Sequence, residues 1–374
     1  MICSKLNLWR SLASLLLLLL STGIWGEQVA DLYTADSPVS GQGAEARAEG
    51  LREAFAKVLV KVSGDRALPG KSAMAKELAK ATSYVQQYAY RALDSQPEAG
   101  VDSEGVPDRL LRVQFDEAAI NQLLRSKGMP VWGRARPLVL IWLGLEIGGQ
   151  RSLFQAEVEP DLRETLEQIA GSRGLPVLFP LMDLEDRASL EVSDVWGVFE
   201  QAIRQASERY QPDVILVGRL RKRSGNDWLA DWTLYQPDGV KHWQTSGQTR
   251  RAVAAEGLQQ TADRLATRYA PQTVTQASTS LRVRVSGLNH LADYLLVKDY
   301  LSSLDSIQSL DLLSASPAEV SFLARVEGGR DGLARGIMLG RVLEPVSVQT
   351  DTIDATSGPV DELEAESLDY RLRK

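Results

Sequence analysis

The chain has 374 residues, a formal net charge of −7 and a single cysteine, Cys3. This length is sufficient for two or three domains, each with its own core. An acidic chain repels nucleic acid and acidic lipid headgroups, which argues against a general polyanion-binding function. Beyond Cys3 the sequence offers no disulfide, no thiolate nucleophile and no thiolate metal site.

The first 26 residues have the pattern of an export signal. Lys5 and Arg10 precede the apolar stretch SLASLLLLLL, which is short for a membrane span, and the polar sequence begins at Glu27. We expect cleavage after Gly26, with an uncleaved anchor as the alternative because Trp25 is a poor residue for a cleavage site. After cleavage, we expect a periplasmic protein without a transmembrane anchor.

Residues 27–130 are predicted to form a small α+β domain. In GAEARAEGLREAFAKVLVKVSG, apolar residues recur at helical spacing (Ala48, Leu51, Phe55, Val58 and Val62), and Gly64 is a suitable terminator for that helix. The stretches SYVQQYAYRAL and DRLLRVQFD are typical of paired strands around a loop rich in proline, glycine and acids. Asp116 is positioned to cap a final helix that ends at Gly128.

A second domain is predicted at 136–272, with the order β-α-β-α-β-β-β-α. Its first strand is the apolar run RPLVLIWLGL, and DVWGVFEQAIRQASERY predicts one continuous helix capped by Asp194. This order indicates a mixed sheet that begins with parallel strands and ends in a hairpin meander.

A third domain is predicted at 281–346, where the order β-α-β-β-α-β is the ferredoxin-like arrangement. The segment 351–374 contains seven acids and few large apolar residues, so we expect an acidic, disordered tail. The predicted fold class is therefore α+β or α/β, with several small mixed-sheet domains in series.

Several strings, in this order, resemble the DUF2066 family of proteobacterial envelope proteins. They include ARAEGLREAFAKVLVKVSGD, YVQQYAYR, GMPVWGRARPLVLIWL and DVWGVFEQAIRQASERYQPDVILVGRL, and the resemblance covers nearly all of 28–346. No activity is assigned to that family, so the resemblance does not imply one for this chain. The middle domain is also similar in order to the anticodon-binding-like fold of the TolB N-terminal domain and of curli-secretion lipoproteins. That likeness concerns the fold, which does not determine function, and it implies protein–protein contacts in the envelope.

Catalytic motifs are mostly absent from the sequence. It has no nucleophile elbow, Ser-x-x-Lys dyad, Walker A motif or dinucleotide-binding glycine motif. The two histidines, His242 and His290, fall in different predicted domains, which argues against a histidine metal site or a Ser-His-Asp relay. We therefore predict no enzymatic activity, no catalytic residue, no metal and no cofactor.

Five carboxylates occur in the stretch MDLEDRASLEVSD (Asp183, Glu185, Asp186, Glu191 and Asp194). A loop after a strand could hold Ca²⁺ or supply an acid/base pair. The glycine of a calcium-binding loop is missing, because Ala188 occupies the sixth position from Asp183. We interpret the stretch as a solvated loop with a helix cap, and a hydrolase that uses Asp183 and Glu185 is the alternative.

Arg219, Arg221 and Arg223 alternate along a predicted strand and therefore project from one face. They could contact an acidic partner or a phosphate, or they could pair across the hairpin with Asp231. These three arginines are candidates for an interaction surface.

Three tryptophans lie within GNDWLADWTLYQPDGVKHWQ, which has the pattern of a hairpin. Trp228 and Trp232 share a strand face with Ala230 and Leu234, so we expect both rings in the core against the closing helix. Trp243, near the far end of the hairpin, is the tryptophan that we expect to meet a ligand.

Together, these features favour an exported, non-enzymatic protein that binds another envelope protein. Export, small domains in series and an acidic tail suit transient contacts. The alternatives are a binding module for a small envelope ligand such as peptidoglycan fragments and a metal-independent hydrolase. We expect no binding of nucleic acid, and the sequence leaves the oligomeric state open.

Overall fold

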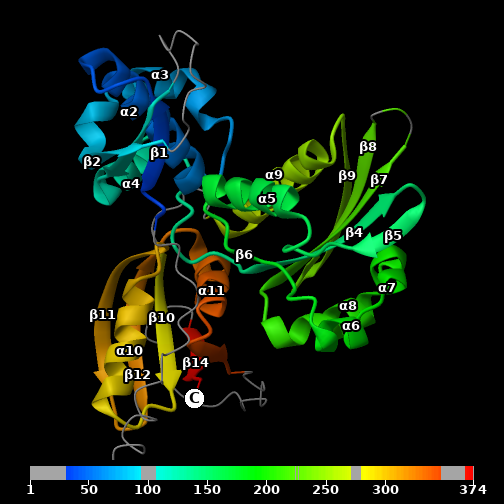
Figure 1. Ribbon diagram of the computed structural model, residues 1–374. Helices are drawn as coiled ribbons and strands as arrows, with labels where there is room; N and C mark the ends of the chain where they lie inside the picture. The colour runs from blue at the N-terminus through cyan, green and yellow to red at the C-terminus, as the bar shows by residue number, and fades with distance from the viewer. Residues whose placement is uncertain are drawn as a thin grey trace, which may run out of the picture.

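The computed structural model describes residues 31–93, 107–223, 225, 227–270, 279–346 and 367–373. Helices and three sheets follow one another in series along the chain, which confirms the predicted α+β class (Figure 1). The predicted export signal lies outside the described residues, as does the first part of the predicted tail, 351–366. Within the described ranges, no helix combines the length and the apolar character needed to cross a membrane.

The N-terminal unit is a three-stranded antiparallel sheet with helices packed on it. Its strands lie in the order β1 (Thr34–Val39), β3 (Arg109–Phe115) and β2 (Val85–Ala92). Its helices are α2 (Ala44–Ser63), α3 (Ser72–Leu78) and α4 (Glu117–Ser126), with short 3-10 turns at Leu68–Gly70 and Ala81–Tyr84. As predicted, Gly64 ends α2 in the left-handed conformation, and the Asp116 carboxylate accepts a hydrogen bond from the Ala119 N–H at the start of α4.

The middle unit is a six-stranded mixed sheet with the order β5-β4-β7-β8-β9, in which β6 also pairs with β4. The strands are β4 (Val139–Ile147), β5 (Gln150–Leu153), β6 (Val177–Leu178), β7 (Val214–Lys222), β8 (Trp228–Gln236) and β9 (Gly239–Gly247). The helices are α5 (Pro160–Arg173), α6 (Leu184–Ser189), α7 (Val192–Gly197), α8 (Glu200–Ser207) and α9 (Arg250–Tyr269), and a 3-10 turn spans Glu208–Tyr210. Strands β4, β6 and β7 are parallel, and β7, β8 and β9 form the predicted antiparallel meander.

Four details of the middle unit differ from the sequence prediction. Strand β5 was not predicted, and the acidic stretch after β6 is not a loop but contains α6. The helix predicted from Asp194 is broken at Val198, which has a left-handed backbone with φ 54°. This break lets Val195 of α7 and Ile203 of α8 enter the same core. Asp194 is not the N-cap of its helix, because Glu191 has that position and its N–H donates to the Asp194 carboxylate.

The C-terminal unit has the predicted order β-α-β-β-α-β with one strand added. It comprises β10 (Thr279–Ser286), α10 (Leu291–Ser302), β11 (Ile307–Ala315), β12 (Glu319–Val326), α11 (Gly329–Leu339), β13 (Leu343–Pro345) and β14 (Ser367–Leu372). The prediction of a disordered tail over 351–374 is wrong for β14, which lies inside the sheet. The physical reason is the alternation of Leu368, Tyr370 and Leu372, whose side chains enter the core of this unit.

A short junction segment, Val131–Arg136, contacts the cores of all three units. Val131 belongs to the core of the N-terminal unit, Trp132 belongs to the core of the middle unit, and Ala135 packs against the core of the C-terminal unit. Gly133 lies directly against Asp305, because a Cβ atom at Gly133 would be 1.5 Å from the Asp305 Oδ2 atom. The same carboxylate accepts a hydrogen bond from the Arg134 N–H at 3.1 Å. Burial raises the pKa of Asp305.

The last residue of the junction segment, Arg136, has a buried guanidinium group. It donates five hydrogen bonds of 2.6–3.1 Å to backbone carbonyls (those of Lys61, Trp132, Gly133, Arg173 and Gly174). Lys61 is in the last turn of α2 and Arg173 is the last residue of α5, so one side chain satisfies carbonyls at the C-termini of two helices. Burial lowers the pKa of Arg136 to about 9.

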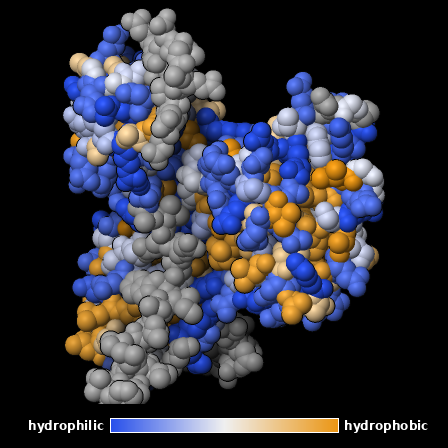
Figure 2. Space-filling view, in the orientation of Figure 1, coloured by the Kyte–Doolittle hydropathy of each residue, from blue (hydrophilic) through white to orange (hydrophobic). Residues whose placement is uncertain are grey.

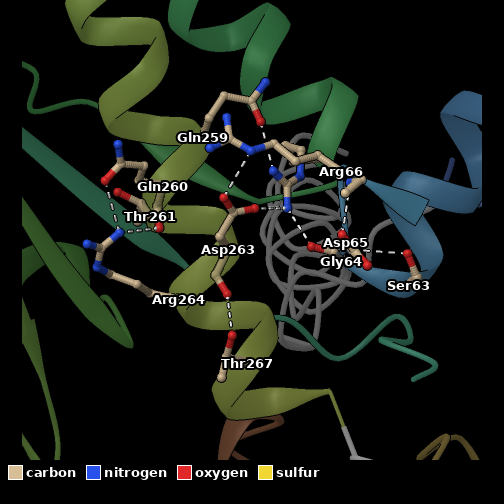
Figure 3. Close-up of polar contacts among 12 residues, drawn as sticks. Ser63, Gly64, Asp65, Arg66, Gln259, Gln260, Thr261, Asp263, Arg264 and Thr267 are labelled. Carbon is tan, nitrogen blue, oxygen red and sulfur yellow. Dashed lines mark hydrogen bonds and ion pairs between the residues drawn. The ribbon is translucent and has the colours of Figure 1, made fainter. Parts of the chain in front are cut away.

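A second group of polar contacts links α9 to the N-terminal unit (Figure 3). Asp263 of α9 lies 2.8 Å from the buried Arg173 guanidinium and 3.2 Å from that of Arg66. Arg173 also donates to the Gly64 carbonyl at 2.6 Å, and Arg66 pairs with Glu256 at 3.0 Å. The N-terminal and middle units therefore meet through arginines that bind helix ends and carboxylates.

The core of the middle unit brings α9 close to the sheet at Gly257. A Cβ atom at Gly257 would lie 2.1 Å from the Trp232 ring, whereas a Cβ atom at Gly171 of α5 would meet nothing within 4 Å. Gly257→Ala should therefore lower the free energy of unfolding by about 1–3 kcal/mol through overpacking. Gly171→Ala should raise it by about 0.5–1 kcal/mol, since alanine favours the helix. Urea denaturation measures both changes, and equal stability of the two variants would contradict this packing.

Candidate functional site

The predicted arginine stripe lies on β7, opposite Asp231 of β8. Arg219 and Arg221 have guanidinium nitrogens 4.0 and 3.3 Å from the Asp231 carboxylate, and Arg219 also donates to the Trp196 carbonyl at 2.8 Å. Arg223 follows the end of β7 and is exposed. The cross-strand interpretation therefore accounts for Arg219 and Arg221, and Arg223 has a solvent-exposed position.

The hairpin tryptophans pack on the core of the middle unit. Trp232 is buried, Trp228 and Trp243 are partly buried against the same core, and the rings of Trp232 and Trp243 stack with centroids 6.4 Å apart. The Arg264 guanidinium lies over the Trp243 ring at 4.1 Å. Trp243, which the sequence suggested as a ligand contact, is thus placed between the core and an arginine of α9.

Within the acidic stretch, Asp183 and Asp186 serve in capping α6 and in binding Arg209, and Glu191 and Asp194 form the capping box of α7. Asp183 accepts a hydrogen bond from the Asp186 N–H at the start of α6, and Arg209 contacts both carboxylates at 2.8–3.0 Å. Asp186 is buried and accepts from the Tyr210 hydroxyl at 2.6 Å. In the described part of the chain, no group of three or more His, Cys, Asp or Glu residues could hold a metal ion.

The two histidines have the ordinary surroundings that the sequence suggested. His242 is exposed on β9, with its Nδ1 atom 3.0 Å from the Thr233 hydroxyl. His290 is the N-cap of α10 and forms a capping box with Asp293. The two side chains belong to different units, and the structure does not bring them together.

A cleft of about 770 Å³ lies between the middle and C-terminal units. One wall comes from the residues just before β7, the β8–β9 turn and the end of α9, and the other wall comes from α11 and the residues after α11 and β14. Figure 1 shows α11 on the side of the C-terminal unit that faces the middle unit. We call this site the arginine cleft because four arginines line it (Arg268, Arg335, Arg341 and Arg373).

Two of the four arginines already have acidic partners. Arg268 pairs with Asp238 of the β8–β9 turn, and Arg341 pairs with Asp213 at 3.4 Å and donates to the Gln211 carbonyl. Among the described residues, the side chains of Arg335 and Arg373 have no hydrogen-bond or ion-pair partner. The cleft therefore presents two guanidinium groups that can bind an anion.

The remaining lining of the arginine cleft is mainly apolar. It includes the rings of Pro212, Pro237 and Tyr269 and the side chains of Met338 and Leu339. Met338 is 48% exposed, so it is accessible to a ligand. A concave site that combines apolar contacts with a few charged groups is the usual form of a ligand site.

Two residues that line opposite walls of the arginine cleft have a strained backbone. Gln211 and Arg341 have φ angles of 47° and 55°, in the left-handed region that favours glycine. The left-handed conformation costs a non-glycine residue roughly 1–2 kcal/mol. Strained residues of this kind concentrate at ligand sites and switch regions. The strain is therefore a second observation, beside the arginines without a partner, that indicates a ligand site in the cleft.

Hydrophobic side chains are also exposed away from the arginine cleft. Figure 2 shows hydrophobic surface over the region of α10 and β11, where Leu291, Leu295 and Leu312 are exposed. Leu184 and Phe199 are exposed on the middle unit. Exposed apolar residues are common on folded proteins.

Comparison with known families gives a match to the N-terminal part of the chain. A family described as Domain of unknown function (DUF8605) matches residues 26–133. The match covers the N-terminal unit and ends inside the junction segment, so it does not reach the arginine cleft. No curated protein matches the sequence. The matched family differs from DUF2066, and the wider resemblance to DUF2066 stays a prediction.

Asp183 allows a test of whether the acidic stretch is structural. Arg209 holds the pKa of Asp183 down at about 2, so the ion pair contributes stability above the usual carboxyl pKa and loses it as the pH falls toward 2. Asp183→Asn keeps a cap acceptor but removes the charge. The melting temperature of this variant should be lower than that of wild type by a constant amount from pH 7 to pH 5. This difference in melting temperature should become smaller between pH 4 and pH 2.

The control for this experiment is Glu185→Gln, whose exposed carboxylate lies 3.5 Å from Arg209 and does not cap α6. Its melting temperature should stay close to that of wild type. A margin for Asp183→Asn that does not change with pH would contradict the ion-pair account.

Proposed function

We propose that this protein is exported to the periplasm, has no enzymatic activity and acts by binding another envelope protein. An acidic segment of the partner would enter the arginine cleft. The observation that carries this proposal is the pair of unpartnered arginines, Arg335 and Arg373, beside an apolar lining. A guanidinium group binds a carboxylate through two parallel hydrogen bonds, and the apolar lining would contact hydrophobic side chains of the same segment.

The charge of the cleft supports an acidic partner. The whole chain has a formal net charge of −7, yet four arginines and one acid, Asp213, line the cleft. Asp213 is engaged within the protein, since it accepts a hydrogen bond from the Leu138 N–H at 2.7 Å and pairs with Arg341. A positive cleft in an acidic protein favours and orients a negatively charged segment.

The composition of the lining also supports binding over catalysis. The described residues that line the cleft include no histidine, serine, cysteine or lysine. Its tyrosine, Tyr269, has its pKa raised by burial, which disfavours the phenolate. The lining thus lacks a nucleophile paired with a base, the arrangement that covalent catalysis needs.

The size of the cleft favours one alternative. A volume of about 770 Å³ lies within the range of small-molecule sites, about 300–1,000 Å³. A peptidoglycan fragment with free carboxylates would make the same contacts with Arg335 and Arg373. The proposal of a protein partner and this alternative share the site and differ in what occupies it.

A photocrosslinking amino acid at Met338, inside the cleft, tests the proposed function in living cells. The full chain should form one discrete protein adduct when irradiated. Arg335→Ala should lower the adduct yield about tenfold, because a lost charge-assisted hydrogen bond costs about 1.5–3 kcal/mol. Adduct yield is read by immunoblot, and protease accessibility in spheroplasts reports whether the protein is in the periplasm.

Two controls make the outcome specific. Arg330→Ala removes an exposed arginine of α11 that does not line the cleft, and it should leave the adduct unchanged. The same photocrosslinker at the exposed Phe199 should not give the adduct. An adduct that is insensitive to Arg335→Ala would overturn the proposal. Arginine-dependent retention on purified peptidoglycan, without a protein adduct, would establish the alternative.

A further inference from the structure

The C-terminal strand β14 occupies an interior position in the third sheet. In a β-α-β-β-α-β unit the first and last strands are neighbours, whereas here β14 lies between β10 and β13. It runs parallel to β10 and antiparallel to β13. In the part of the chain that the structure describes, β14 is the strand through which β13 joins the sheet.

The side chains of β14 complete the core of the C-terminal unit. Leu368, Tyr370 and Leu372 are buried, and they alternate with polar residues on the other face of the strand. On that face, the Asp369 carboxylate lies 3.6 Å from the Arg284 guanidinium. The strand is therefore held by two ladders of backbone hydrogen bonds and by three apolar side chains.

The end of β14 also forms part of the arginine cleft. Arg373 directly follows the strand, and its N–H donates to the Val342 carbonyl at 2.9 Å. Val342 is adjacent to Arg341, the strained residue that contacts Gln211 across the cleft. Two of the four cleft arginines, Arg341 and Arg373, thus lie where β13 and β14 pair.

We propose that β14 is a conditional part of the binding site, so that the cleft binds a carboxylate-bearing segment only while β14 is inserted. This inference rests on the proposed function of the cleft. Because Arg373 reaches the ligand only from the inserted strand, a bound carboxylate stabilises the inserted form. By thermodynamic linkage, insertion raises the affinity for the ligand by the same factor. Withdrawal of β14 from the sheet would abolish ligand binding in the cleft.

The test uses the full chain and a fluorescein-labelled nonapeptide of alternating glutamate and leucine as the probe. Fluorescence anisotropy gives its Kd for wild type, Arg335→Ala, Arg373→Ala and Tyr370→Ala. Arg373→Ala should weaken binding about tenfold.

Tyr370→Ala should also weaken binding, although Tyr370 does not line the cleft, because removal of this buried ring destabilises the insertion of β14 in the sheet. Arg371→Ala, an exposed residue of β14 outside the cleft, is the matched control and should bind like wild type.

Hydrogen exchange of the β14 amides gives a second readout that does not depend on variants of the core. The probe should slow exchange of residues 367–372 in wild type and should not do so in Arg373→Ala. If Tyr370→Ala fails to fold, Arg373→Ala and the exchange measurement still decide the question.

The outcomes separate this inference from the proposed function. One outcome is that Arg335→Ala loses binding, Arg373→Ala binds like wild type, and the probe leaves hydrogen exchange of β14 unchanged. This outcome would overturn the coupling between β14 insertion and ligand binding, and the cleft would remain a binding site. If wild type does not bind the probe at millimolar concentration, the proposed carboxylate site is overturned, and the coupling falls with it.

Discussion

The arrangement of the units depends on one buried cation, the guanidinium group of Arg136. Burial of a charge is costly unless polar groups surround it. Here five backbone carbonyls do so, and those at the ends of α2 and α5 carry the partial negative charge of helix C-termini. The guanidinium also lies over the Trp132 ring at 4.2 Å. The same side chain thus satisfies the ends of helices from two units, which fixes their relative position.

The junction segment extends this constraint to the C-terminal unit. Gly133 and Arg134 contact Asp305 of that unit, and Arg341 reaches the middle unit at Asp213. The contact between Arg341 and Asp213 is part of the lining of the arginine cleft. Its walls belong to different units, so the width of the cleft depends on the contacts that position these units, at the junction and at Arg341.

The sequence predicted the elements whose patterns are local and regular. Helical spacing over 44–63, with Gly64 as terminator, and the alternation along the Trp228 hairpin both led to the observed structure. The prediction failed where composition outweighed a short pattern. Six acids between 351 and 366 masked the alternation of Leu368, Tyr370 and Leu372. It also failed at Val198, because a left-handed β-branched residue is held by tertiary packing and has no local signal.

The candidate site could not be predicted from the sequence, because its residues come together only in the fold. Arg268, Arg335 and Arg373 belong to three separate segments, and each is an ordinary surface arginine when considered alone. The arginines that do form a visible sequence pattern, Arg219 and Arg221, face Asp231 within one hairpin. The structural role of Arg136 also had no sequence signal, because this arginine is simply the first residue of the apolar run RPLVLIWLGL.

The central claim, that Arg136 fixes the N-terminal and middle units relative to each other, is tested most directly by distances between spin labels. Cys3 is the only cysteine, so in a Cys3→Ser background labels can be placed in pairs at the exposed Lys76, Lys241 and Lys298, one in each unit. We expect one narrow distance distribution for each pair in otherwise wild-type protein and a broad distribution for the Lys76–Lys241 pair after Arg136→Met. Narrow, unchanged distributions in a folded Arg136→Met protein would contradict the account.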